Sequence, residues 1–115
     1  MMRMFQSLQH CWRICAQMMK SRNISTYDFF IRLRDDAYFL QDWLPPLSWL
    51  NYPSSVFTAD CLNWRGMNDK TIVCNSIHCA RVYFERLALD ATVYFDKLNN
   101  VSNSESITAA VFAKH

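Results

Sequence analysis

Glycine is almost absent from this chain of 115 residues, which contains a single glycine, Gly66, and three prolines. The phosphate-binding loops of nucleotide-dependent enzymes need several glycines at fixed spacing, so the sequence excludes sites of that kind. Tight hairpins between neighbouring strands also draw heavily on glycine and other turn residues. The shortage therefore favours helices over a sheet. No other pattern in the sequence indicates a ligand site, so no cofactor and no small-molecule ligand is predicted.

Long apolar runs are absent as well. No stretch approaches the length that spans a bilayer, and the first residues lack the uninterrupted apolar segment of a secretory signal. We therefore expect no membrane insertion, and we expect the protein to lie in the cytoplasm. In that compartment the five cysteines of the chain would remain reduced thiols.

Acidic side chains are absent from residues 1–27, which hold the basic residues Arg3, Arg13, Lys20 and Arg22. The net charge of the whole chain is only +2, an excess too small to indicate nucleic-acid binding. A basic amphipathic helix without acids is also typical of membrane-surface segments and of mitochondrial targeting segments. Both stay open as alternatives to a first helix that simply packs into the core.

Apolar side chains are abundant: they make up 51% of the residues, aromatic ones 15%, and charged ones only 19%. That apolar share is too high for a disordered chain and predicts a packed core. The length favours a single domain over residues 1–115. Apolar surface beyond what so small a domain can bury would face a partner.

Helical spacing of apolar residues recurs along the chain. It predicts helices over residues 2–20, 25–44, 54–64 and 69–99, and a capping pattern at Ser102 and Glu105 predicts a last short helix. The longest register predicts an unbroken helix through Val73, Ile77, Ala80, Phe84, Leu87, Ala91, Tyr94 and Leu98. The predicted fold is therefore all-α: an irregular bundle of four or five helices with one long helix in the C-terminal half.

Cysteine and histidine occur four residues apart in two of these predicted helices, as Cys11 with Cys15 and as Cys74 with His78. Such pairs share a helix face, and two pairs on facing helices could bind zinc tetrahedrally. Free cysteine also packs as a small apolar residue. Core packing is the preferred interpretation, with no metal site. A zinc- or redox-responsive helical domain is the alternative.

Catalysis by a cysteine and a histidine would need a thiol, a base and a third group that orients the base. Cys61 or Cys79 with His10 or His78 could supply the first two. Nothing in the sequence places these residues together, so no catalytic residue is assigned and the chain is not predicted to be an enzyme.

The segment "DWLPPLSWLNY", residues 42–52, is the strongest candidate for binding. Adjacent prolines restrict its backbone, and aromatic side chains on a rigid turn are typical anchors of an interface. Alternatively, its tryptophans close one end of the bundle. The predicted function is a small protein-interaction module, such as an accessory, inhibitor, immunity or chaperone-like factor, that binds a protein partner or itself. The predicted binding residues are Trp43, Leu47, Trp49, Leu50 and Tyr52.

Overall fold

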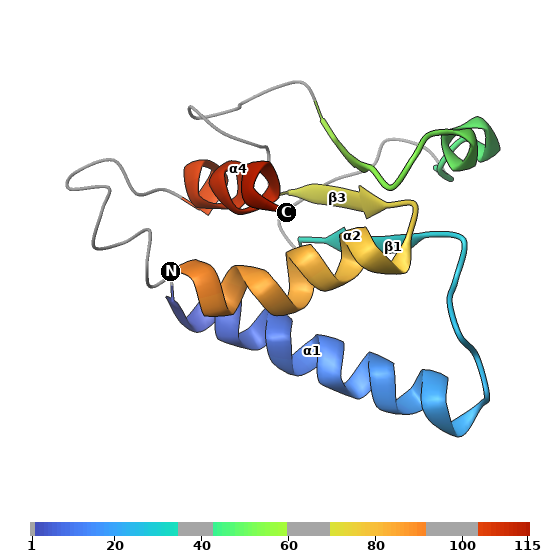
Figure 1. Cartoon of the computed structure of the whole chain (residues 1–115), viewed down its shortest axis with the longest axis horizontal. Coiled ribbons are helices and arrows are strands. Elements are labelled where there is room, and N and C mark those ends of the chain that lie inside the picture. Colours follow the sequence, from blue (N-terminus) through green and yellow to red (C-terminus); the bar gives the residue numbers. More distant parts are fainter. Residues whose placement is uncertain (1, 35–42, 60–69, 92–103) are drawn as a thin grey trace.

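Helices and a small antiparallel sheet form the structure together, so the predicted all-α helical bundle is wrong. The computed structural model describes residues 2–34, 43–59, 70–91 and 104–115. Its elements are, in chain order, α1 (Met2–Ser21), β1 (Phe30–Leu33), the 3-10 helix η1 (Leu47–Asn51), β2 (Val56–Thr58), β3 (Thr71–Cys74), α2 (Ile77–Arg81), the π-helical turn η2 (Val82–Arg86) and α4 (Ser104–Lys114) (Figure 1).

The first helix confirms the prediction made from its apolar stripe. Within α1 the buried side chains are Phe5, Leu8, Trp12 and Met19, which follow helical spacing. The helix ends where Asn23 adopts a left-handed conformation with φ 55°. The backbone N–H groups of Asn23 and Ile24 then donate to the carbonyls of Lys20 and Met19 at 3.2 and 2.8 Å, the pattern of a Schellman cap.

The helix predicted over residues 25–44 is wrong in the part that is described, because Phe30–Leu33 forms strand β1 and no described residue of the range is helical. Residues 35–42 of that range lie outside the described part of the chain. The segment begins with Phe29, Phe30 and Ile31, which are aromatic or β-branched and fit a pleated surface. Pairing with β3 then decides in favour of the strand. The helix predicted over residues 54–64 is wrong in its described part, because Val56–Thr58 forms β2, while residues 60–64 lie outside the described residues.

Strand β3 also overturns the predicted unbroken helix over residues 69–99. Thr71–Cys74 is extended, and helix begins only at Ile77. The hydroxyl of Ser76 caps that start by accepting a hydrogen bond from the Cys79 N–H at 3.1 Å. From there helical structure continues through η2 to Ala91, and the remaining positions of the predicted helix lie outside the described residues.

The sheet has the order β1-β3-β2, and both pairings are antiparallel. In the register Ile31 lies opposite Val73, and Val73 opposite Phe57, so these three side chains form one row across the sheet. Successive residues of a strand point to opposite faces. Phe30, Ile72 and Cys74 therefore point to the other face, where they join the helices in the core.

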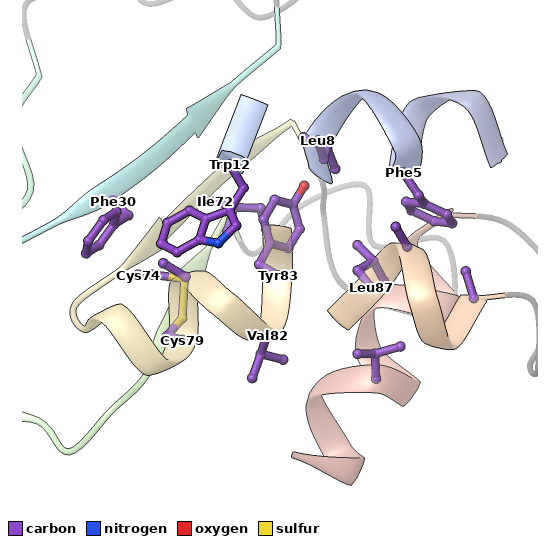
Figure 2. Close-up of a cluster of buried hydrophobic side chains, with 14 of the residues drawn as sticks. Phe5, Leu8, Trp12, Phe30, Ile72, Cys74, Cys79, Val82, Tyr83 and Leu87 are labelled. Carbon is purple, nitrogen blue, oxygen red and sulfur yellow. A yellow bond between two sulfur atoms is a disulfide. The ribbon is translucent and has the colours of Figure 1, made fainter. Parts of the chain in front are cut away.

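The main core lies between that face of the sheet and the helices. Figure 1 shows α1 beside the helix that begins with α2, and residues of η2 contact both α1 and α4. Trp12 of α1 packs on Phe30 of β1, with ring centroids 5.8 Å apart (Figure 2). Trp12 also stacks on Phe84 of η2, with ring centroids 6.0 Å apart. Helix α4 confirms the predicted last helix and buries Ile107 and Val111, while its predicted cap residue Ser102 lies outside the described residues.

Asp90 is a buried carboxylate at the edge of this core. Its Oδ2 lies 2.8 Å from Nε2 of His115 and 3.6 Å from Nζ of Lys114, while Oδ1 lies 3.6 Å from Arg86. Burial raises the pKa of Asp90, but the hydrogen bond with His115 and the charges of Lys114 and Arg86 outweigh it, so the pKa lies below its ordinary value of 3.8. The ionised carboxylate thus stabilises the fold.

Replacing Asp90 with Asn should lower the free energy of unfolding by about 1 kcal/mol at pH 7. Because the pKa of Asp90 is lowered on folding, its contribution is complete well above pH 3.8 and is lost as the pH falls through the lower folded value. Urea denaturation at several pH values should therefore show the gap between wild type and D90N closing in acid. The control Glu85→Gln changes a carboxylate on the same helix. A gap of constant size from pH 7 into acid would contradict the assignment.

Candidate interaction surface

The segment from Trp43 to Pro53 is an ordered turn on the outside of the sheet. After Pro45 and Pro46 the chain enters η1, where the Trp49 N–H donates to the carbonyl of Pro46 at 3.0 Å. The helix ends when the Tyr52 N–H donates to the carbonyl of Trp49 at 3.3 Å. Proline fixes φ and cannot continue a ladder, so this segment forms a compact turn.

Asn75, which lies more than twenty residues later in the sequence, holds this turn in place. The residue directly follows β3, and its Nδ2 lies 2.8 Å from the Trp49 carbonyl, 3.2 Å from that of Tyr52 and 3.3 Å from that of Pro53. Its Oδ1 accepts a hydrogen bond from the Ser55 N–H at 2.7 Å. One amide side chain thus ties both η1 and the start of β2 to the junction of β3 and α2.

The predicted binding residues lie together in this turn, and most are exposed. Leu47 and Tyr52 are 75% and 60% exposed, and Trp43 and Leu50 are also on the surface. Leu44, which was not among the predicted binding residues, lies beside them and is 84% exposed. We call Trp43, Leu44, Leu47, Leu50 and Tyr52 the connector surface. An apolar group of this size on a small domain is typical of an interaction site.

Trp49, the remaining predicted binding residue, is half-buried beneath the connector surface. Its ring stacks on Phe57 of β2 with centroids 4.2 Å apart and planes 8° from parallel, and Trp43 packs on it at 6.3 Å. A hollow of about 270 Å³ opens beside these rings and reaches Val73 of β3. Residues 43–53 thereby partly cover the face of the sheet that points away from the helices. Trp49 acts as the base of the surface.

The cysteines do not form the zinc-binding pairs that were considered as an alternative to core packing. Cys74 and Cys79 are joined in a disulfide between the end of β3 and the first turn of α2 (Figure 2). The expectation of reduced thiols is therefore wrong for these two residues, and Cys74 has no thiolate to offer a metal. Cys11 is exposed and Cys15 half-buried, both as free thiols. Within the described ranges no three metal-binding side chains come together.

The residues considered for catalysis are not brought together either. Cys79 is oxidised in the disulfide, so it cannot act as a nucleophile. His10 is exposed on α1 and His78 is exposed at the start of α2. Cys61 and Gly66 lie outside the described residues. The absence of a catalytic residue stays a prediction.

Sequence reasoning found the connector but missed what fixes it. Asn75 stands between a β-prone run and Ser76, a residue type that commonly starts a helix. If Asn75 is taken as the end of a strand and Ser76 as the cap of a helix, the sequence predicts a strand-to-helix junction at this point. Asn75 would then have been recognisable as a turn residue with a side chain available for hydrogen bonds.

Comparisons with protein-family models, with curated proteins and with solved structures found no match. No helix in the described ranges is both long enough and apolar enough to cross a membrane. The arguments below therefore rest on the geometry of this chain.

Proposed function

We propose that this protein acts by contact, as a mixed α/β module that binds another protein, or a second copy of itself, through the connector surface. The observation that carries the proposal is the exposure of Leu44 and Leu47 on a turn whose backbone is held by Asn75. A surface that is ordered before binding loses little conformational entropy when a partner arrives.

The energies fit such a role. Burying a leucine side chain fully stabilises a complex by about 2 kcal/mol. Leu44 and Leu47 are the most exposed of the large apolar side chains described, so they have the most to gain. Trp43 and Tyr52 are of the aromatic type enriched at the centre of interfaces. We propose an accessory or inhibitory role, without catalysis.

The test replaces both leucines with serine, as the double variant L44S/L47S. Because both side chains are exposed, the free energy of unfolding should change by less than about 0.5 kcal/mol. Self-association in sedimentation velocity, or retention of a partner from the source extract, should fall at least about tenfold, which corresponds to about 1.4 kcal/mol. The matched control is Ile14→Ser on α1, which is also exposed.

If L44S/L47S binds the partner as tightly as the Ile14→Ser control does, the proposal is contradicted. Substitution of Trp49 is a weaker test, because its stacking on Phe57 means that truncation would lower both stability and binding.

For the compartment, the sequence predicts the cytoplasm, with mitochondrial import as the alternative. Disulfides persist mainly in oxidising compartments. The Cys74–Cys79 disulfide supports an oxidising location over the cytoplasm. Alkylation of the protein immediately on cell lysis tests this, since a cytoplasmic protein should be labelled at both residues.

A further inference from the structure

The connector surface includes a short segment in the polyproline II (PPII) conformation. A residue that precedes proline is held in extended geometry, so Leu44 and Pro45 both favour PPII. Pro46 has φ −59° and ψ 132°, which lie close to ideal PPII values. Because PPII has three residues per turn, Leu44 and Leu47 fall on the same edge of the segment. Both are among the most exposed apolar side chains described.

An aromatic hollow lies beside this PPII segment. Its volume is about 270 Å³, and its wall includes the rings of Trp43, Trp49 and Phe57 together with Val73 of β3. Proline-rich PPII segments dock in grooves lined by aromatic rings. Indole N–H groups also suit the carbonyls of such a segment, because PPII has no internal hydrogen bonds. The chain therefore carries both halves of one recognition mode.

The PPII segment does not occupy the hollow of its own chain. None of residues 44–47 lines the hollow, and Leu44 and Leu47 are exposed to solvent. The two parts are nevertheless neighbours, since Trp43 directly precedes the segment and Trp49 follows it by two residues. A second copy of the chain could supply to each hollow the segment that its own chain leaves outside.

Charge favours a second copy as the occupant. Residues 43–59 contain no acidic, basic or histidine side chain. The two residues of β3 that line the hollow, Thr71 and Val73, are uncharged as well. A charged segment would lose its hydration here without gaining a counter-charge, which is costly. Residues 44–47 carry no charge, so these surfaces of two copies meet without repulsion between their contact residues.

We propose that two copies of this chain form a symmetric dimer in which residues 44–47 of each copy pack in the aromatic hollow of the other. The inference rests on the proposed function and selects its partner. An interface with a two-fold axis uses the same patch on both subunits, and here that patch holds both parts. Figure 1 shows η1, in green, at the periphery and well away from α1, so α1 does not obstruct a second copy.

Two variants each remove one half of the contact. L44S/L47S removes the apolar edge of the segment and keeps the hollow. Ala59→Arg fills the hollow and keeps the segment, since Ala59 lines the hollow and is exposed. In sedimentation velocity the wild type should dimerise, and each variant should dimerise about a hundredfold more weakly, because both tenfold contacts are lost. Ala16→Arg, at an exposed position of α1, is the matched control and should dimerise as wild type.

A mixture of the two variants tests reciprocal docking. In a mixed pair the A59R copy supplies an intact segment and the L44S/L47S copy supplies an open hollow, so one of the two contacts is restored. The mixture should therefore associate about tenfold more tightly than either variant alone, and about tenfold more weakly than wild type. If the leucines instead packed on each other across the interface, the mixture would combine both defects and gain nothing.

A peptide tests the hollow apart from dimerisation. The probe is a fluorescein-labelled peptide of residues 43–48 between polar flanks, and the matched peptide has both prolines replaced by alanine. By fluorescence polarisation, L44S/L47S should bind the first at least about tenfold more tightly than the second, because its hollow is free. Adding A59R to this variant should abolish binding of both peptides.

Four results would overturn the inference. They are a monomer at every concentration up to about 500 µM, a dimer that A59R leaves intact, a mixture no tighter than its components, and equal binding of the two peptides. A monomer that captures another protein through Leu47 would overturn the dimer and leave the proposed function intact. A dimer that L44S/L47S leaves intact, with no protein captured through Leu47, would contradict both.

Discussion

Replacing Asn75 with Ala should lower the free energy of unfolding by about 2 to 3 kcal/mol. The Asn75 side chain accepts a hydrogen bond from the Ser55 N–H at 2.7 Å, and the two hydrogens of its Nδ2 are shared among three carbonyls of residues 49–53 at 2.8 to 3.3 Å. Each such bond contributes about 1 kcal/mol, and part-buried groups left without a partner add a cost of their own. Chemical denaturation followed by tryptophan fluorescence measures the change directly.

The same variant should detach the connector from the sheet. Without Asn75 the stacking of Trp49 on Phe57 is the main described contact that holds η1 against β2. Binding through the connector surface should weaken even at temperatures where the N75A protein is folded, because the turn must then be ordered on binding. Asn51→Ala, at an exposed position of η1, is the matched control. Equal effects of N75A and N51A would show that Asn75 does not hold the turn.

Removing the Cys74–Cys79 disulfide should lower the free energy of unfolding by about 2 kcal/mol, the chain-entropy estimate for so short a closed loop. The double variant C74A/C79A avoids leaving an unpaired buried thiol, since both sulfurs lie in the core. The physical reason is that the disulfide also joins these two residues in the unfolded chain, which lowers the conformational entropy of the unfolded state.

The control is the double variant C11S/C15S, which changes two thiols that are not in a disulfide. It should change the unfolding free energy by less than about 0.5 kcal/mol. Alkylation of the unreduced native protein should label Cys11 and Cys15 and leave Cys74 and Cys79 unlabelled. Equal stability of wild type and C74A/C79A would show that the disulfide adds nothing to the fold.

The helices at the two ends of the described chain could be predicted from sequence, and the sheet could not. In α1 the apolar stripe is long and uninterrupted, and it continues over the full element. Scarcity of glycine favours helices over a sheet only where the strands are joined by tight hairpins. Here β1, β2 and β3 are joined by long connections, and β1 pairs with β3 across the intervening β2 in sequence. Such long-range pairing leaves no local signal.

The predicted long helix shows how a periodic pattern can join two different elements. Val73 belongs to β3 and Ile77 to α2, yet their spacing matches a helix. The β-branched run Thr71–Val73 favours a strand instead. Pairing with β1 on one side and β2 on the other stabilises that strand in the fold. The connector was predictable because prolines and exposed aromatic residues act locally. Asn75 and the disulfide were not, because each depends on which residues the turn after β3 brings together.

Site-specific photo-crosslinking at Leu47 tests the central claim, that the connector surface contacts a partner. The protein carrying benzoylphenylalanine at position 47 is irradiated in extract from its source, beside the same label at exposed Gln17 on α1. The label reaches only what touches that side chain, so binding elsewhere on the molecule does not register. The account predicts one discrete adduct, with a second protein or a second copy of the chain, from position 47 and none from position 17. No adduct from position 47, or the same adduct from both positions, would contradict it.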